Sequence, residues 1–200
     1  MKKRYEILDK ICCYAGFFTV NRYRLRHELF AGGWGHPIER ELLERGHAVG
    51  VIAYDPRLDR VVMVEQFRIG ALEARGGPWT IEFIAGIVEP GERDEEVAVR
   101  ETLEEAGIDI HDLAPVCDFV LSPGGCSERL ALYCGRVDAA TAGGLHGVEA
   151  EGEDIRVRVF DRDAALALLD SGEHLLSAST VVGLQWLALH HAELRTRWNA

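Results

Sequence analysis

The chain has 200 residues with 33 acidic and 22 basic side chains, and its formal net charge of −11 argues against non-specific binding to a nucleic-acid backbone. Its hydrophobic content of 48% is enough for one buried core plus an extension, and no apolar stretch approaches the roughly 18 residues of a membrane-spanning helix. The basic start has no apolar segment after it, so we expect no secretory signal. Five cysteines, an odd number without a CxxC pair, disfavour a zinc site or a disulfide framework and favour reduced thiols in a cytoplasmic protein.

Residues 14–46 are predicted to form an N-terminal section of β-strands. The stretch FFTVNRYRLRHELF is rich in aromatic and branched residues and alternates between polar and apolar positions, as half-buried strands do. The glycine-rich AGGWGHP predicts a turn. The following IERELLERGH is compatible with a strand or a helix, and its position directly after the turn favours a strand.

The middle of the chain predicts further strands. AVGVIAYD and RVVMVEQFRI are apolar strands joined through PRLD as a hairpin, and GGPWTIEFIAG predicts one more strand. Beyond residue 108 we expect two strands, a long polar glycine-rich loop, another strand and two helices that each begin at a capping residue. In chain order these segments are LAPVCDFVLSPGG, ERLALYCGRVD, ATAGGLHGVEAEGED, IRVRVF, DRDAALALLDSG and SASTVVGLQWLALHHAEL. The pattern predicts an α+β fold in which a mixed sheet lies between helices.

The segment GIVEPGERDEEVAVRETLEEAGI predicts a loop followed by an unusually acidic helix. Seven acids and two arginines lie between Glu92 and Glu105. Asp94 is the predicted N-cap, and Gly107 is predicted to end the helix. At about 100° per residue, one side of this helix is apolar and the other acidic. The predicted apolar side holds Ala98, Val99, Thr102, Leu103 and Ala106, and the acidic side holds Glu101, Glu104 and Glu105.

The acidic side of this helix has two interpretations. Composition alone favours a solvated surface. Carboxylates three and four residues apart, however, lie about 5–6 Å from one another on a helix. Oxygen ligands at that separation suit a hard divalent cation, which would offset the repulsion between them.

The order of residues in this segment resembles the Nudix box of the Nudix hydrolases. Gly86 is followed after five residues by Glu92, then after seven residues by Arg100-Glu101, and the pattern closes with Glu104-Glu105, one residue, Gly107 and Ile108. Thr102 departs from the pattern, which usually has an aliphatic residue there. The resemblance implies the Nudix fold, with a mixed sheet sandwiched between helices (α/β/α), and metal-dependent hydrolysis of a nucleoside diphosphate linked to another group.

Segments outside the box resemble the bacterial ADP-ribose pyrophosphatase branch of this family. The resemblance implies Mg-dependent hydrolysis of the diphosphate of ADP-ribose to AMP and ribose 5-phosphate. Two alternatives stay open: a pyrophosphatase for other ADP-sugars or nucleotide sugars, and a regulator that binds ADP-ribose without cutting it, which would be expected to have a damaged box. Departures from the branch are Trp34, Glu39 and Cys126. The segments that carry the resemblance are GFFTVNRYRLRH, ERELLERGHAV, VVMVEQFRIGA, LSPGGCSER, GLHGVEAEGEDIRV and GLQWLALHH.

The resemblance also implies roles for acidic residues. Glu101 and Glu105 are the expected ligands of Mg²⁺, or of Mn²⁺ as its substitute, with Glu104 nearby. The carbonyl of Ala85 and the carboxylate of Glu153 are the other expected ligands. Glu151 corresponds to the general base, and Arg100 is expected to orient the carboxylates of the box. Acids in a glycine-rich loop are often simply solvated, and that interpretation of Glu151 and Glu153 stays open.

A second group of residues is expected to bind substrate. Arg68 is the candidate phosphate contact, and Phe17 and Phe18 are candidates to stack on adenine, although core or interface packing would also explain two adjacent aromatic residues. Arg40, Glu41 and Arg45 are expected to line the nucleotide site, although the two arginines could also be plain surface charges. Ile87 is a further expected substrate contact. Four others are expected to contact the terminal ribose: Ser122, Pro123, Gly124 and Glu128.

The N-terminal section is expected to be distinct from the catalytic part. We assign residues 1–46 to an N-terminal β extension used for dimerisation and residues 47–200 to the Nudix hydrolase domain. A short strand pair is not stable alone and needs a partner for its apolar side. The resemblance implies a homodimer in which the N-terminal section is exchanged between subunits.

Overall fold

The computed structural model describes residues 3–200, except for the side chain of Glu151. The chain divides into two compact units. The first comprises residues 1–47 together with Val120–Arg129, and the second comprises Ala48–Phe119 together with Leu130–Ala200.

The first unit is a three-stranded antiparallel sheet in the order β1-β2-β3. Its strands are β1 (Tyr5–Ala15), β2 (Thr19–His27) and β3 (Ile38–Glu44). β3 is a strand, as its position after the turn predicted, but β1 was missed by the sequence analysis. Two register shifts in its pairing with β2, between Ile7 and Asp9 and between Cys12 and Tyr14, explain this, because each shift interrupts the alternation that marks a strand.

The second unit contains a mixed eight-stranded sheet. Six strands follow the order β10-β11-β5-β4-β9-β8, while β6 pairs with β5 and β7 pairs with β4. β4 and β9 are parallel, and β4 is antiparallel to β5, as the predicted hairpin requires. The strands are β4 (Ala48–Asp55), β5 (Arg60–Phe67), β6 (Trp79–Glu82), β7 (Ile84–Ile87), β8 (Asp112–Val120), β9 (Arg129–Arg136), β10 (Leu145–His146) and β11 (Ile155–Asp161).

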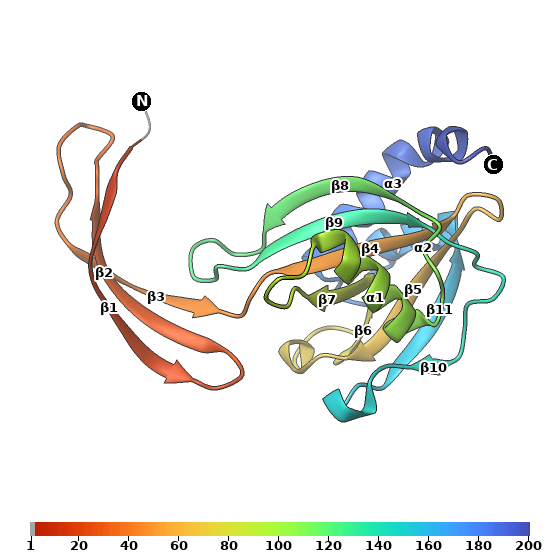
Figure 1. The fold of residues 1–200 in the computed structure, drawn as a ribbon, viewed down its shortest axis with the longest axis horizontal. Helices are drawn as coiled ribbons and strands as arrows, with labels where there is room; N and C mark the ends of the chain where they lie inside the picture. Colours follow the sequence, from red (N-terminus) through yellow and green to blue (C-terminus); the bar gives the residue numbers. More distant parts are fainter. Residues whose placement is uncertain (1–2) are drawn as a thin grey trace. The chain divides into compact units, whose positions relative to one another are not determined.

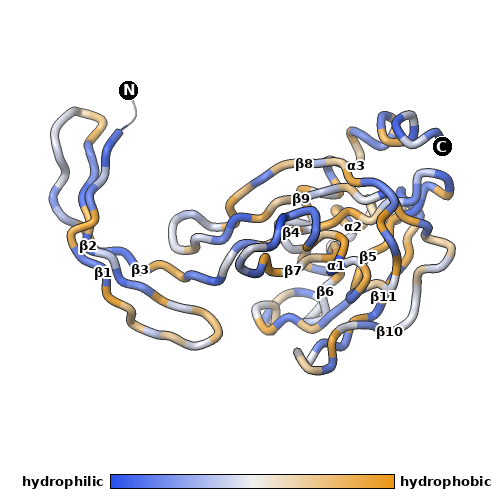
Figure 2. The backbone as a smooth tube through the Cα atoms, viewed as in Figure 1, coloured by the Kyte–Doolittle hydropathy of each residue, from blue (hydrophilic) through white to orange (hydrophobic). Residues whose placement is uncertain are grey.

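Helices cover both faces of this sheet, which confirms the predicted α+β sandwich (Figure 1). Helix α1 (Asp94–Ala106) shares one core with alternate residues of β4, such as Val49 and Val51. Helices α2 (Arg162–Ser171) and α3 (Ala178–Arg197) share the other core with the intervening residues, such as Ile52. Figure 2 shows the hydrophobic character of β4 that this double burial requires. No helix within residues 3–200 has the length and apolar character needed to cross a membrane.

Two local predictions around α1 were wrong. The segment predicted as a single strand is two strands, because β6 pairs with β5 whereas β7 pairs with β4. The chain passes from one neighbour to the other at the buried Phe83. Helix α1 begins at Asp94, so the N-cap is Arg93 and not Asp94; the Arg93 backbone N–H donates to the Glu96 carboxylate at 3.1 Å. Gly107 ends the helix in the left-handed region (φ 65°), as predicted.

The predicted division of α1 into an apolar and an acidic side was also wrong. Val99 and Leu103 are 46% and 55% exposed, whereas Glu105 is only 2% exposed. The helix packs on the sheet through small residues, and the buried Glu105 carboxylate faces the backbone of β7 rather than water. Thr102, at the position where the box usually has an aliphatic residue, is buried. Its hydroxyl donates to the carbonyl of Ala98 at 2.7 Å, so the buried polar group has a hydrogen-bond partner within the helix.

Candidate active site

Glu105 is a buried carboxyl group between α1 and the sheet. Its Oε2 accepts a hydrogen bond from the Ala85 backbone N–H at 3.1 Å, and its Oε1 lies 3.5 Å from Nε2 of the buried Gln66. Loss of solvation raises the pKa of Glu105 to about 8, and the charges of Glu101 and Glu153 add to this rise. The fold therefore holds a carboxyl group whose ionisation is unfavourable unless a positive charge is supplied.

Glu101 lies one turn before Glu105 and packs against the backbone of β7. Burial, and less strongly the neighbouring acids Glu104 and Glu153, raise the pKa of Glu101, although Arg100 opposes this effect. A Cβ atom at Gly86 would overlap the Glu101 carboxylate, so only glycine allows this close approach. Gly86, the first residue of the box, therefore leaves space for the carboxylate of Glu101, a later residue of the same box.

Arg100 connects the acidic residues on this side of α1. Its guanidinium donates to both carboxylate oxygens of Glu92, at 3.0 and 3.1 Å. Nη1 also donates to Glu101 at 2.7 Å and to Glu104 at 3.1 Å, and Nη2 donates to the Ile87 carbonyl at 3.3 Å. These contacts, led by the hydrogen bonds to Glu92, raise the pKa of Arg100, which stays charged.

The loop between β10 and β11 adds another acid to this group. Glu153 accepts a hydrogen bond from the Val148 backbone N–H at 2.9 Å, and its charge contributes to the raised pKa values of Glu101 and Glu105. Glu151 ends a short 3-10 helix, and its side chain lies outside the described part of the structure. The loop contacts α1 through the Gly147 N–H, which donates to the Glu104 carbonyl at 3.3 Å.

Arg68 lies just after β5, on the same unit as the acidic group. Its Nε donates to Glu82 at 2.9 Å, and its charge partly opposes the rise in the pKa of Glu105. Sequence reasoning missed Glu82 and Gln66. Gln66 lies on β5 two residues before Arg68, and this spacing was the one available signal for its role; Glu82 gave none.

The remaining predicted substrate residues, apart from Ile87, lie in the first unit. The exposed Phe17 ring lies 4.9 Å from that of Phe18 in an edge-to-face arrangement. The Arg45 guanidinium lies 5.2 Å from the Phe18 ring and pairs with the buried Glu128 at 3.3 Å. Arg40 and Glu41 are exposed on β3, and Ser122, Pro123 and Gly124 are exposed in a turn closed by hydrogen bonds to the Ser122 carbonyl.

The loop Val120–Arg129 is held within the first unit by backbone pairing with β3. The Leu43 N–H donates to the Gly125 carbonyl at 2.8 Å, and the Ser127 N–H donates to the Leu43 carbonyl at 3.1 Å. The Ser127 hydroxyl also donates to Glu44 at 2.8 Å. Within the first unit, the structure therefore brings the loop predicted to contact the terminal ribose together with β3 and Arg45, which are predicted to contact the nucleotide.

The chemistry of the second unit's acidic group suits a divalent cation. Within the described side chains, no three acidic, histidine or cysteine residues already form a set that could hold a metal ion. The charge of Glu153 nevertheless contributes to the raised pKa of Glu101 and to that of Glu105, and a cation bound among these carboxylates would relieve this repulsion. Their oxygen donors fit Mg²⁺ or Mn²⁺.

Comparison with known proteins gives concordant results. The sequence profile of the NUDIX domain matches residues 44–199. Proteins named ADP-ribose pyrophosphatase are 45% identical over 197 residues in Escherichia coli (strain K12; 98% of this chain and 94% of the relative) and 47% identical over 196 residues in Haemophilus influenzae (96% and 90%). A GDP-mannose pyrophosphatase of Salmonella arizonae is 31% identical over 159 residues (76% and 79%). The crystal structure of an ADP compounds hydrolase, 19% identical, superposes with a TM-score of 0.65 over 92% of this chain and 95% of that chain.

Proposed function

Because the chain belongs to the NUDIX domain family, we propose that it hydrolyses the diphosphate of ADP-ribose to AMP and ribose 5-phosphate. The observation that carries this proposal is the pair of Glu101 and the buried Glu105, whose pKa values are raised by burial and, less strongly, by the charge of Glu153. The names of the relatives from E. coli and H. influenzae support ADP-ribose as the substrate.

The acidic group is the proposed holder of Mg²⁺, or of Mn²⁺ in its place. Glu101, Glu105 and Glu153 supply carboxylates, with Glu104 nearby, and Ala85 supplies its carbonyl oxygen. When bound, such ions neutralise the diphosphate and help to form the attacking hydroxide. Ala85 already contacts Glu105 through its N–H, which keeps this backbone segment beside the carboxylate.

Other side chains handle the proton and the substrate. Glu151 takes the proton of the attacking water, in a loop that contacts α1. Arg68 contacts a phosphate oxygen in place of, or in addition to, Glu82. Arg100 acts as a positioning residue, because its guanidinium joins Glu92, Glu101 and the Ile87 carbonyl and so fixes the backbone and side chains around the carboxylates.

The first unit is proposed to bind the nucleotide end and to form a homodimer by exchange between subunits. All residues of β1 are exposed, and among the described residues of the first unit only Asn21 and Glu128, both polar, are buried. A sheet without an apolar core of its own is stabilised by a partner. We accordingly assign residues 1–46 to dimerisation and residues 47–200 to catalysis. Five free cysteines support a reducing, cytoplasmic location.

Product analysis with ADP-ribose and Mg²⁺ tests the proposal. We expect stoichiometric AMP and ribose 5-phosphate, and a decrease in kcat of about 10²–10⁴ in Glu101→Gln. Glu95→Gln is the matched control, because Glu95 is an exposed acid on the same helix that pairs with Arg93. Equal activity of the wild type and Glu101→Gln at saturating Mg²⁺ would overturn the assignment of Glu101.

A broader nucleotide-sugar pyrophosphatase is the second candidate, supported by the 31% identity to a GDP-mannose pyrophosphatase. ADP-glucose and GDP-mannose, assayed beside ADP-ribose, distinguish the two by their kcat/KM values. Binding of ADP-ribose without any product would instead favour a non-catalytic regulator, although all charged residues of the box are present.

A further inference from the structure

Three polar residues lie on one face of the paired strands β5 and β6. Gln66 is paired with Thr80 across the two strands, and Glu82 follows Thr80 by two positions. Residues that are paired directly, and residues two apart on one strand, point to the same side of a sheet. Val64, which is paired with Glu82, packs in the core that α1 shares, so this is the side that α1 covers.

Glu82 holds the Arg68 side chain through its Nε atom. Oε2 of Glu82 accepts a hydrogen bond from Arg68 Nε at 2.9 Å, and the Glu82 side chain is only 13% exposed. No other acid of the described residues forms an ion pair with Arg68, whose side chain is 43% exposed. A guanidinium has five N–H donors, and four of them are on the two Nη atoms. The pair with Glu82 therefore leaves the Nη groups available for a second acceptor.

Thr80 fixes the other oxygen of the Glu82 carboxylate. Its hydroxyl donates to Oε1 of Glu82 at 2.9 Å, and Thr80 itself is buried. Both carboxylate oxygens thus have a donor, one from a buried strand residue and one from Arg68. An arginine side chain loses much conformational entropy when it is ordered, so a carboxylate held in this way lowers the cost of ordering Arg68 when a ligand binds.

The same row of polar side chains ends at the acidic group of α1. The Gln66 carbonyl lies 3.5 Å from the Thr80 hydroxyl, and Gln66 Nε2 lies 3.5 Å from Oε1 of Glu105. The charge of Arg68 lowers the pKa of Glu105, against the larger effect of burial. The Arg68 guanidinium is therefore held near the carboxylates that are proposed to bind the metal.

We propose that Glu82 is a positioning residue for the hydrolysis of ADP-ribose, and that it holds Arg68 through Nε so that the Nη groups contact the phosphate. This inference rests on the proposed function, in which Arg68 is the phosphate contact, and adds that the pair with Glu82 persists when the substrate binds. A role of Glu82 as a base or a metal ligand would depend on its charge, whereas positioning depends on its acceptor oxygens, and the two can be separated.

Comparison of Glu82→Ala with Glu82→Gln separates these roles. Alanine removes both acceptors, whereas glutamine keeps an oxygen for Arg68 Nε and loses the charge. Calorimetric titration with ADP-ribose in EDTA measures binding, and AMP formation with Mg²⁺ measures kcat/KM. We expect Glu82→Ala to weaken binding and lower kcat/KM about tenfold or more, the effect of losing a charge-assisted hydrogen bond, and Glu82→Gln to recover most of this loss. Equal losses in both variants would overturn the proposal.

A double-mutant cycle with Arg68→Gln provides the second test. Because Glu82 acts through Arg68, Glu82→Ala should have almost no further effect on binding or kcat/KM once Arg68 is glutamine. Additive losses would overturn the proposal. Asp161→Ala is the matched control, because Asp161 pairs with Nε of Arg60 at 3.0 Å at the other end of β5, and both quantities should be unchanged.

Thr80 keeps the test valid if Glu82→Ala does not fold. Thr80→Val removes the hydroxyl that holds Glu82, and Thr80→Ser retains it. We expect a severalfold loss of binding and of kcat/KM in Thr80→Val and values close to the wild type in Thr80→Ser; a Thr80→Val protein equal to the wild type would overturn the proposal. Wild-type protein that binds ADP-ribose but forms no AMP would contradict the proposed function alone, because the titrations in EDTA still test whether Glu82 acts through Arg68.

Discussion

Replacing Glu105 by glutamine should stabilise the metal-free protein, and the gain should grow with pH. The pKa of Glu105 is raised by burial from 4.5 to about 8. Because the folded state holds this proton more tightly than the unfolded state, the associated stability is fully present below pH 4.5 and is lost as the pH rises toward 8. Between pH 4 and pH 7 the loss amounts to about 3 kcal/mol, at up to about 1.4 kcal/mol per pH unit.

Urea unfolding of both proteins in EDTA at several pH values measures this effect. Other titrating groups contribute to both curves, so the relevant quantity is the difference in unfolding free energy between Glu105→Gln and the wild type. Glutamine keeps the size of the side chain and can still accept the Ala85 N–H. We expect the difference to increase by about 3 kcal/mol from pH 4 to pH 7 and to level off above pH 8.

A pH-independent difference between the two proteins would refute this reasoning, because it would mean that Glu105 does not titrate with a raised pKa. Added Mg²⁺ provides a second test. A cation that binds the ionised carboxylates should raise the unfolding free energy of the wild type more at pH 8 than at pH 5. Glu105→Gln should show a much smaller effect.

Three other substitutions test separate parts of the site. Gly86→Ala should fold but displace the Glu101 carboxylate, and thus raise the Mg²⁺ concentration needed for half-maximal activity; an unchanged requirement would show that this close approach is not needed. Glu151→Gln should lower kcat with little change in Mg²⁺ affinity, whereas Glu153→Gln should weaken Mg²⁺ binding, and the reverse outcome would exchange the two roles. Deletion of residues 1–46 should give a monomer or an aggregate with little ADP-ribose hydrolysis, and a fully active monomer by light scattering would contradict the proposed exchange.

The sequence predicted those elements whose signals are local. The period-two alternation or continuous apolar character of β2, β4, β5 and β11, and the glycine that ends α1, depend on near neighbours in the chain. The box pattern likewise located the acidic group, because its spacing places carboxylates one turn apart. The same reasoning missed β1, because two register shifts in its pairing with β2 interrupt the alternation of polar and apolar residues.

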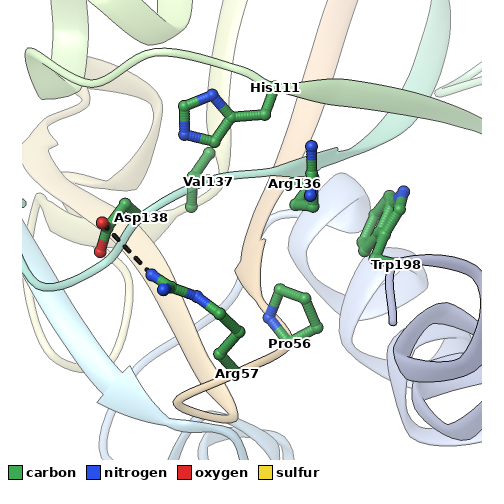
Figure 3. Close-up of a pocket in the computed structure, with 7 residues that line it drawn as sticks. All are labelled: Pro56, Arg57, His111, Arg136, Val137, Asp138 and Trp198. Carbon is green, nitrogen blue, oxygen red and sulfur yellow. Dashed lines mark ion pairs between the residues drawn. The ribbon is translucent and has the colours of Figure 1, made fainter. Parts of the chain in front are cut away.

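Features that depend on packing could not be predicted from spacing. The orientation of α1 followed from which side chains fit against β7, and the burial of Glu105 required a backbone N–H that only the folded sheet provides. A cavity of the second unit is lined by Arg57, His111, Arg136 and Trp198, which come from four distant parts of the chain, so no single stretch of sequence could have predicted it (Figure 3). Tertiary contacts, rather than helical periodicity, decided which acid would be buried.

The high density of acids on α1 is tolerated because the fold separates them into different environments. Arg100 offsets Glu92, Glu101 and Glu104 through direct hydrogen bonds. Burial keeps Glu105 largely protonated at neutral pH, so it adds little negative charge to the metal-free helix. The acids of the first turn are favourable near the positive end of the helix dipole, and they are Asp94, Glu95 and Glu96. What the metal-free protein disfavours is the ionisation of Glu105 beside Glu101 and Glu153, and it is there, rather than along the whole acidic helix, that a divalent cation would have the most repulsion to relieve.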